Sequence, residues 1–164
     1  MRYLITFACY GAHLHGDDAG SVDQNHNLFG SHLVQPDPQR ARAEREKMPQ
    51  PPYLLDAESR QVVLTAVRRH CEHRGWNLLA THVRTNHVHI AVEAEVQPER
   101  VMVEFKSYAS RALNSRGLDA PDRKRWARHG STRWLFQDRD VAKAIQYVID
   151  SQGAPMALFV ADGY

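Results

Sequence analysis

The feature that most constrains the fold is the order in which strand-like and helix-like hydrophobic patterns follow one another. Segments rich in β-branched and aromatic residues, or alternating between apolar and polar residues, predict strands over 2–9, 76–83, 87–94 and 133–136. Apolar residues at helical spacing predict helices over 56–74, from Pro98 to Gly117, and from Asp138, as N-cap, to Gly153. The first six elements follow the order strand, helix, strand, strand, helix, strand.

This order is typical of the ferredoxin-like fold, an antiparallel sheet covered on one face by helices. We therefore predict an α+β protein with that sheet, an extra C-terminal helix, and a long N-terminal insertion. The insertion covers residues 11–52, lacks hydrophobic periodicity and holds five of the eight prolines. Such a length predicts a functional loop or an excursion over the surface. The length of the chain predicts one domain over 1–164.

Composition and charge exclude several classes of protein. The formal net charge of +2 excludes a polycation that binds nucleic acid by overall charge alone. Cys9 and Cys71 form no Cys-x-x-Cys pair, which gives no support to a zinc knuckle or a redox motif. The apolar stretch over 3–10 is too short to span a bilayer. We expect a cytoplasmic protein without a membrane partner.

The sharpest local feature is the His87-Val88-His89 sequence on a predicted strand. Side chains alternate along a strand, so the two imidazoles project from one face and can reach one metal ion. Such a pair is also compatible with two half-buried, hydrogen-bonded rings. A second pair, His13 and His15, lies in the glycine-rich loop and is less suited to a rigid site.

The remaining question is which group would act beside such a pair. The sequence has no Ser-His-Asp order, no His-Glu-x-x-His and no glycine-rich phosphate loop. A tyrosine phenol can attack phosphorus when a cation polarises the phosphate or a base is near. Tyr108 lies in the apolar stripe of its helix, which predicts a core role. Tyr147 projects away from the stripe of the last helix and can reach a cleft.

Three motifs together resemble one known family. They are Asn86-His87-Val88-His89-Ile90 on a strand, Phe105-Lys106-Ser107 with Ser110-Arg111 on the next helix, and Ile145-Gln146-Tyr147-Val148 on the last helix. The combination resembles the single-tyrosine HUH transposases, which include insertion-sequence and REP-associated tyrosine transposases. The likeness runs from about Leu54 to Gly153.

The resemblance implies a metal-dependent transposase that cleaves and joins single-stranded DNA. It implies that His87 and His89 bind Mg²⁺ or Mn²⁺, and that Tyr147 is the nucleophile that forms a 5′-phosphotyrosine link and frees a 3′-hydroxyl. Relatives carry a third ligand, Gln or Asn, about one turn after the tyrosine. Here that position is Ser151, so we nominate the next residue, Gln152, with Asp150 as a weaker substitute.

The charge distribution predicts where DNA would bind. Residues 100–139 hold ten Arg or Lys against four acidic residues, whereas residues 1–39 hold one Arg against four Asp. We expect phosphate contacts from the second helix and the following loop, with Trp126 and Trp134 available for base stacking. The nominated residues are Lys106, Arg111, Arg123, Lys124, Arg125 and Arg128. The resemblance implies single-stranded or hairpin DNA as partner and a homodimer.

Two other functions are compatible with the sequence. One is a catalytically weak or inactive DNA-binding relative, such as a repressor, which Ser151 at the expected ligand position favours. The other is a zinc hydrolase that uses His87, His89 and either His82 or His13. His82 could also flank the site from the preceding strand, but we expect it to be structural. If Tyr147 is not the nucleophile, Tyr108 is the next candidate.

Overall fold

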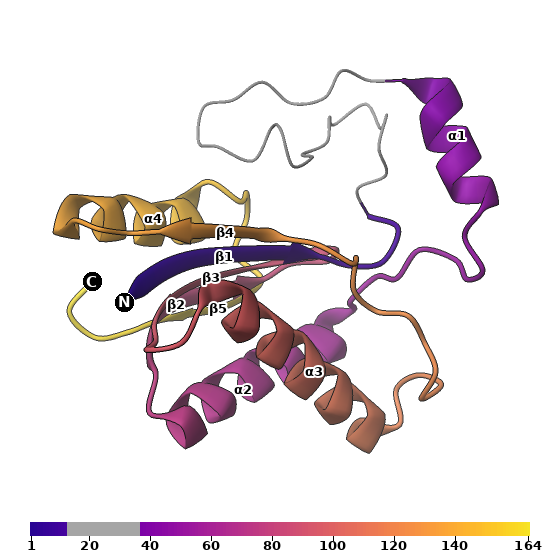
Figure 1. The fold of residues 1–164 in the computed structure, drawn as a ribbon. Coiled ribbons are helices and arrows are strands. Elements are labelled where there is room, and N and C mark those ends of the chain that lie inside the picture. Colours follow the sequence, from indigo (N-terminus) through magenta and orange to yellow (C-terminus); the bar gives the residue numbers. More distant parts are fainter. Residues whose placement is uncertain (13–36) are drawn as a thin grey trace.

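The computed structural model describes residues 1–12 and 37–164, which form a five-stranded antiparallel sheet with helices (Figure 1). The strands are β1 (Arg2–Ala8), β2 (Asn77–Val83), β3 (His87–Glu93), β4 (Ser131–Trp134) and β5 (Ala157–Val160). Their spatial order is β4-β1-β3-β2-β5, and every neighbouring pair is antiparallel. Without β5 this is the ferredoxin-like order, so the predicted fold class is confirmed.

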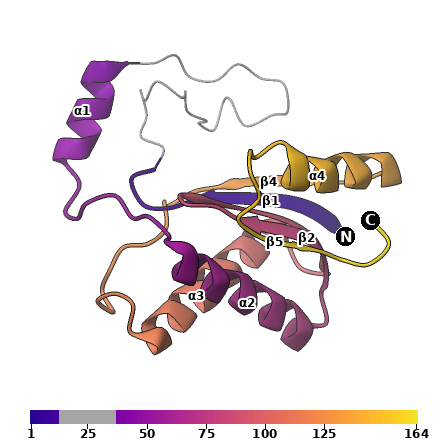
Figure 2. The same ribbon diagram turned by 180° about the vertical axis from the view of Figure 1, so that it is seen from behind.

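Helices cover both faces of the sheet. The four helices are α1 (Pro38–Glu46), α2 (Ala57–Arg74), α3 (Pro98–Arg116) and α4 (Asp138–Asp150). Figures 1 and 2 show α2 and α3 on one face and α4 on the opposite face. The central strand β3 is therefore enclosed from both sides, and a polar side chain on it must find its partner inside the protein.

The alternation of side chains along β1 divides the core into two layers. Tyr3, Ile5 and Phe7 face α2 and α3 and pack with residues such as Val67 and Phe105. Leu4 points to the other face, where it belongs to the smaller cluster under α4. That cluster contains the buried stripe of α4, namely Val141, Ala144, Ile145 and Val148. Helix α4 is thus held by an apolar stripe, as its sequence predicted.

Local capping sets where the helices begin and end. The side chain of Asp56 accepts a hydrogen bond from the backbone N–H of Ser59 at 2.8 Å and begins α2. The prediction that Asp138 caps α4 is wrong. Gln137 occupies that position in a reciprocal box with Asp140, while Asp138 accepts from the Arg2 guanidinium at 2.6 Å.

Two elements were not predicted from the sequence. Helix α1 lies inside the segment 11–52, which the sequence indicated to be irregular. It begins at Asp37, whose side chain accepts from two backbone N–H groups, and Ala41 is its single buried residue. Strand β5 extends the sheet beyond β2. Across the described residues, no helix combines the length and apolar character that crossing a bilayer requires.

Gly130 allows the chain to approach β1 closely just before β4 begins. A Cβ atom at this position would lie 2.6 Å from the carbonyl oxygen of Thr6 and 2.5 Å from Met102 Sδ. The methionine can move, but the backbone oxygen is fixed in the sheet. Any side chain at residue 130 would therefore push β4 away from β1.

We expect Gly130→Ala to lower the free energy of unfolding by about 3 kcal/mol, because overpacking against backbone forces a strand shift. Gly75→Ala is the control. Gly75 has φ +66° but open space around it, so its substitution should cost about 1 kcal/mol of conformational strain. Urea denaturation of both variants compares the two costs, and equal losses would contradict the close approach at Gly130.

Candidate active site

The strand register places the side chains of the candidate site in a row across the sheet. Thr6 of β1 and His82 of β2 both lie directly opposite His89 of β3. Paired residues of neighbouring strands point to the same face, so these side chains lie on the face that α4 covers. His87 is two residues before His89 and projects from the same face. The two imidazoles predicted from the sequence to lie together have ring centroids 4.7 Å apart.

Each imidazole is oriented by a polar partner that holds its Nδ1 atom. His87 Nδ1 lies 2.6 Å from Asn86 Oδ1, and His89 Nδ1 lies 2.9 Å from Thr6 Oγ1. An amide oxygen only accepts, so with the ring proton on Nδ1 His87 donates to Asn86, and its Nε2 would then be the atom that carries a lone pair. Neither Thr6 nor Asn86 was assigned a role from the sequence, because only strand pairing and turn geometry bring them to the rings.

His89 is buried and has one ring nitrogen that no described residue bonds; with the ring proton on Nδ1, donated to Thr6 Oγ1, that nitrogen is an acceptor. Its residue is 3% exposed, and its Nε2 atom has no hydrogen-bond partner among the described residues. Burial, reinforced by the neighbouring His87, lowers the pKa of His89 from 6.5 to about 3, so the ring is neutral at physiological pH. A buried polar atom left unsatisfied costs free energy. The ring is therefore suited to bind a cation or a hydrogen-bond donor.

Gln152 brings a third oxygen or nitrogen ligand to the pair. Its Oε1 atom lies 3.3 Å from His87 Nε2, while its amide nitrogen lies 3.5 Å from the carbonyl oxygen of Tyr147. If the His87 proton is on Nδ1, the Nε2 and Oε1 atoms would each present a lone pair to a shared cation; if it is on Nε2, His87 donates to Gln152. Neutral imidazole and amide oxygen suit a divalent metal, so these residues fit the predicted metal site.

The alternatives for the third ligand lie elsewhere. Ser151 is the C-cap of α4, and its backbone N–H donates to Tyr147 O. Asp150 is exposed and lines a groove with Tyr164 and residues of α4. Among the described residues no group of three His, Cys, Asp or Glu side chains is placed to hold a metal. Within the described part of the chain, an amide ligand is what complements the two histidines.

Tyr147 lies next to the histidine pair and is open to solvent. Its residue is 40% exposed, as its direction away from the stripe of α4 predicted. Its ring meets the His89 ring edge-on, with centroids 5.4 Å apart. Arg133, half-buried on β4, attracts the Tyr147 phenol electrostatically. The phenol therefore lies beside a buried, neutral imidazole and within the electrostatic range of a guanidinium.

The other candidate tyrosine lies in the opposite layer of the protein. Tyr108 is 36% exposed, and its ring stacks on His70 of α2 with centroids 3.9 Å apart. The prediction of a core role is wrong, because the buried stripe of α3 runs through Val101, Phe105 and Ala109 and leaves Tyr108 at its flank. Figure 2 shows α2 and α3 on the opposite face of the sheet from α4, whereas the register places the histidine pair on the α4 face. Tyr108 is thus not placed to act with it.

No third histidine among residues 1–12 and 37–164 completes a three-histidine site. His82 is fully buried, and both its ring nitrogens are hydrogen-bonded to backbone groups of the residues Val148 and Met156. This bears out its expected structural role and leaves it no free nitrogen for zinc. His13 and His15 lie outside the described residues.

Several residues predicted to contact DNA have partners inside the protein. Lys106 Nζ donates to the carbonyls of Ala127 and His129 at 2.9 and 3.1 Å, and burial lowers the pKa of Lys106 to about 8. Arg125 is 3% exposed, and its guanidinium contacts Asp119 at 3.0 Å and Asn114 at 2.8 Å. Lys106 and Arg125 therefore make contacts that support the fold, and their predicted contact with DNA stays a prediction.

The other nominated residues differ in how free their side chains are. Arg123 donates to Gln50 and to the carbonyl of Pro51, which ties the basic loop to the segment before α2. Exposed side chains are those of Arg111, Lys124 and Arg128. Of the two tryptophans, Trp126 donates from its ring nitrogen to Lys106 O and Ser110 Oγ. Trp134 is 39% exposed and stacks on the exposed ring of Phe136.

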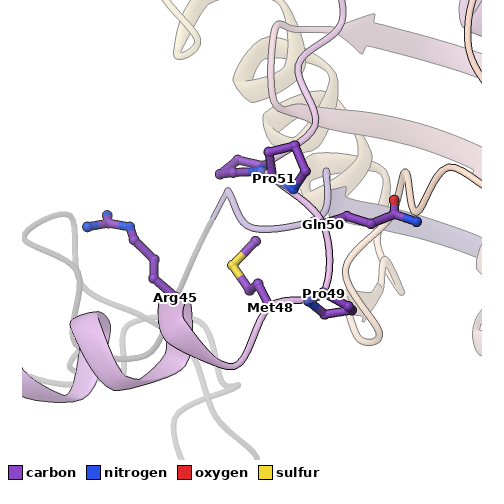
Figure 3. Close-up of a pocket in the computed structure, with 6 residues that line it drawn as sticks. Arg45, Met48, Pro49, Gln50 and Pro51 are labelled. Atoms are coloured by element: carbon purple, nitrogen blue, oxygen red, sulfur yellow. The ribbon is translucent and has the colours of Figure 1, made fainter.

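A separate pocket lies between the end of α1 and residues 48–52. Figure 3 shows its lining, formed by Arg45, Met48, Gln50 and three prolines. Its volume is about 330 Å³. Gln50 is already bonded to Arg123 and to the backbone N–H of Lys124, so the lining presents little reactive chemistry. The candidate site is instead the group His87, His89, Tyr147 and Gln152, on the α4 side of the sheet, where Tyr147 is exposed and His89 is buried.

Comparison with known families decides the class of the protein. The sequence profile described as "Transposase IS200 like" matches residues 52–146, more than half of the chain. The chain belongs to the IS200-like transposase family. The matched part of the chain contains His87 and His89 but ends one residue before Tyr147, so the roles of Tyr147 and Gln152 do not follow from the match.

Two solved structures resemble this transposase. One is a REP-associated tyrosine transposase bound to a REP hairpin, with 11% identity, a TM-score of 0.49, and coverage of 90% of this chain and 63% of that one. The other is an inferred transposase from Deinococcus radiodurans R1, with 13% identity, a TM-score of 0.46, and coverage of 90% and 88%. The chain thus spans less than two thirds of the first protein. No curated protein matches.

Burial of His89 predicts that the metal-free protein loses stability in acid. The folded-state pKa of about 3 lies below the unfolded value of 6.5, so protons favour the unfolded chain as pH falls below 6.5. Between pH 7 and pH 5 we expect the free energy of unfolding to fall by about 2 kcal/mol through this residue. Urea denaturation in a chelator measures it. His89→Gln should flatten the slope, and an unchanged slope would contradict the assignment.

A second prediction compares the stability contributions of two arginines of the basic loop, the buried Arg125 and the exposed Arg128. Arg125→Met should lower the free energy of unfolding by about 3 kcal/mol, because it leaves the half-buried Asp119 carboxylate without its ion pair. Arg128→Met, three residues away and exposed, should change stability by less than about 0.5 kcal/mol. Thermal or chemical denaturation measures both. A similar small loss in the two variants would show that Arg125 does not support the fold.

Proposed function

We propose that this transposase-family protein cleaves and rejoins single-stranded DNA through a covalent link to Tyr147, with His87, His89 and Gln152 holding Mg²⁺ or Mn²⁺. The observation that carries the proposal is the edge contact between the Tyr147 and His89 rings, 5.4 Å between centroids. It places a solvent-exposed phenol beside a buried imidazole whose Nε2 has no partner among the described residues. A nucleophile and a metal ligand are thus neighbours on one face.

The donor set does not make a structural zinc site, which is closed by four protein ligands. Two imidazoles and an amide oxygen leave further coordination positions open for water or phosphate oxygens. When bound, the cation would neutralise charge on the oxygens of the scissile phosphate. Thr6 and Asn86 hold the Nδ1 atoms, which fixes the direction in which each Nε2 points.

The chain's own groups can carry the proposed cleavage. Tyr147 Oη attacks the phosphorus as the bond from phosphorus to the 3′-oxygen breaks. The phenol gives up its proton, and the departing 3′-oxygen takes one up, which leaves a 5′-phosphotyrosine and a free 3′-hydroxyl. Arg133 interacts electrostatically with the Tyr147 phenol and places a positive charge near the reacting groups. Reversal, with a 3′-hydroxyl as the attacking group, rejoins the strand without an external energy source, because one phosphodiester replaces another.

The position of Gln152 bears on the alternative of an inactive, repressor-like relative. That alternative relied on Ser151 at the expected ligand position. The backbone turns after α4, so that the residue following Ser151 presents its amide oxygen to His87. A one-residue shift of the ligand is therefore compatible with an active site.

For the DNA surface we retain the exposed cations Arg111, Lys124 and Arg128, and Trp134 as a stacking residue. Single-stranded or hairpin DNA is the proposed partner, and a homodimer remains a prediction of the family resemblance. Backbone phosphates would meet the cations, and an exposed aromatic ring can stack on any base.

The proposal is tested by incubating the protein with Mn²⁺ and labelled single-stranded oligonucleotides from the DNA flanking its own gene. A labelled protein band should survive a denaturing gel, because the phosphotyrosine bond is covalent. Tyr147→Phe should abolish the band, since phenylalanine has no hydroxyl to attack phosphorus. Tyr108→Phe is the matched control, because that tyrosine is similarly exposed in the opposite layer, and it should leave the band unchanged.

Gln152→Ala should weaken Mn²⁺ binding, measured by calorimetry, and reduce the band without removing it. A band that persists in Tyr147→Phe would show that another residue is the nucleophile. Binding of DNA and Mn²⁺ without any band would favour the repressor-like function instead.

A further inference from the structure

His82 joins three parts of the protein that carry the candidate site. It is fully buried on β2, directly opposite His89. Its Nδ1 lies 3.0 Å from the carbonyl oxygen of Val148 in α4, and its Nε2 lies 3.0 Å from the backbone nitrogen of Met156. One side chain therefore connects the sheet, the helix that bears Tyr147 and the segment that follows Gln152.

The partners of His82 determine where its proton lies. The Val148 carbonyl can only accept a hydrogen bond, so Nδ1 must carry the proton and donate. The Met156 N–H can only donate, so Nε2 must be the acceptor. A neutral imidazole offers this donor and acceptor at a fixed separation on a rigid ring. Apolar side chains of similar size would leave both backbone groups unsatisfied inside the protein.

The two backbone partners lie beside the residues that would do the chemistry. Val148 follows Tyr147, and its carbonyl is among the last four of α4, which lack partners within the helix. Met156 comes four residues after Gln152, just before β5. Arg84 holds the same segment at the carbonyl of Ala154. The path of the chain from Tyr147 to β5 is thus fixed at its two ends by His82.

We propose that His82 is a positioning residue that sets the distance of Tyr147 and Gln152 from the His87–His89 pair. The inference rests on the proposed function of that pair and of Tyr147. It assigns His82 no contact with DNA or metal. Its effect comes through α4 and the segment after it, and a displacement of about 1 Å in a reacting group can slow a reaction about 100-fold.

The test compares His82→Leu with His70→Leu as a matched control. His70 is likewise buried and hydrogen-bonded, but it lies in the α2–α3 layer and contacts Glu104. Both variants lose a buried histidine and its hydrogen bonds. We measure the rate of covalent adduct formation per folded molecule, Mn²⁺ affinity by calorimetry, and hydrogen exchange of the amides over 151–157.

We expect His82→Leu to slow adduct formation about 100-fold, weaken Mn²⁺ binding, and speed exchange at Met156. His70→Leu should match the wild-type protein in all three measurements. His82→Gln, whose amide supplies a donor and an acceptor, should recover part of the rate. Wild-type adduct rate and Mn²⁺ affinity in folded His82→Leu would overturn the proposal.

Met156→Pro tests the same contact if His82→Leu does not fold. It removes the N–H donor to His82 and leaves the histidine in place, and a wild-type rate and Mn²⁺ affinity in that variant would overturn the inference. If the wild-type protein forms no adduct, the proposed function fails. The Mn²⁺ affinities of the His82 and His70 variants then decide the positioning role: equal values overturn it, and selective weakening in His82→Leu supports it.

Discussion

The pairing register of β1, β3 and β2 is the constraint on which the rest of the site depends. It aligns Thr6, His89 and His82 across the sheet, each opposite its neighbour. A slip of one residue in either pairing would turn the row to the opposite face. His89 would then lose both Thr6 and the side of the sheet that α4 covers. The apolar residues Ile5 and Ile90, which face α2 and α3, stabilise the register by the same alternation.

Helices on both faces of the sheet bury His89 and so determine its protonation state. A six-element ferredoxin-like fold leaves one face of the sheet open, whereas here α4 closes that face over His89. Burial lowers the pKa of His89 and keeps the ring neutral, the form in which imidazole binds a metal. The same helix ends beside the row, so the element that desolvates His89 also brings Tyr147 to it. Packing and chemistry therefore depend on one helix.

Features that depend on periodicity could be predicted from the sequence, whereas features that depend on strand pairing could not. The stripe of α4 predicted both its buried face and the outward direction of Tyr147, and alternation placed His87 and His89 on one side of β3. Thr6 carries no signal until β1 is paired with β3. Helix α1 escaped detection because it buries only Ala41 and has no apolar stripe. The predicted core role of Tyr108 was wrong because neighbouring residues of a helix point in different directions. A position one residue away from the buried stripe can already lie at its exposed flank.

Charge along the sequence was the least reliable guide to the DNA surface, for a physical reason. A lysine or arginine near buried carbonyls and carboxylates is drawn into the fold, as Lys106 and Arg125 are. Their contacts secure the loop after α3, from which β4 then runs to Arg133 beside Tyr147. Lys106 and Arg125, which the sequence count included among the cations, thus support the site through contacts inside the protein. We expect phosphate contacts from the cations that remain exposed, and these are fewer than the number of Arg and Lys in the sequence indicated.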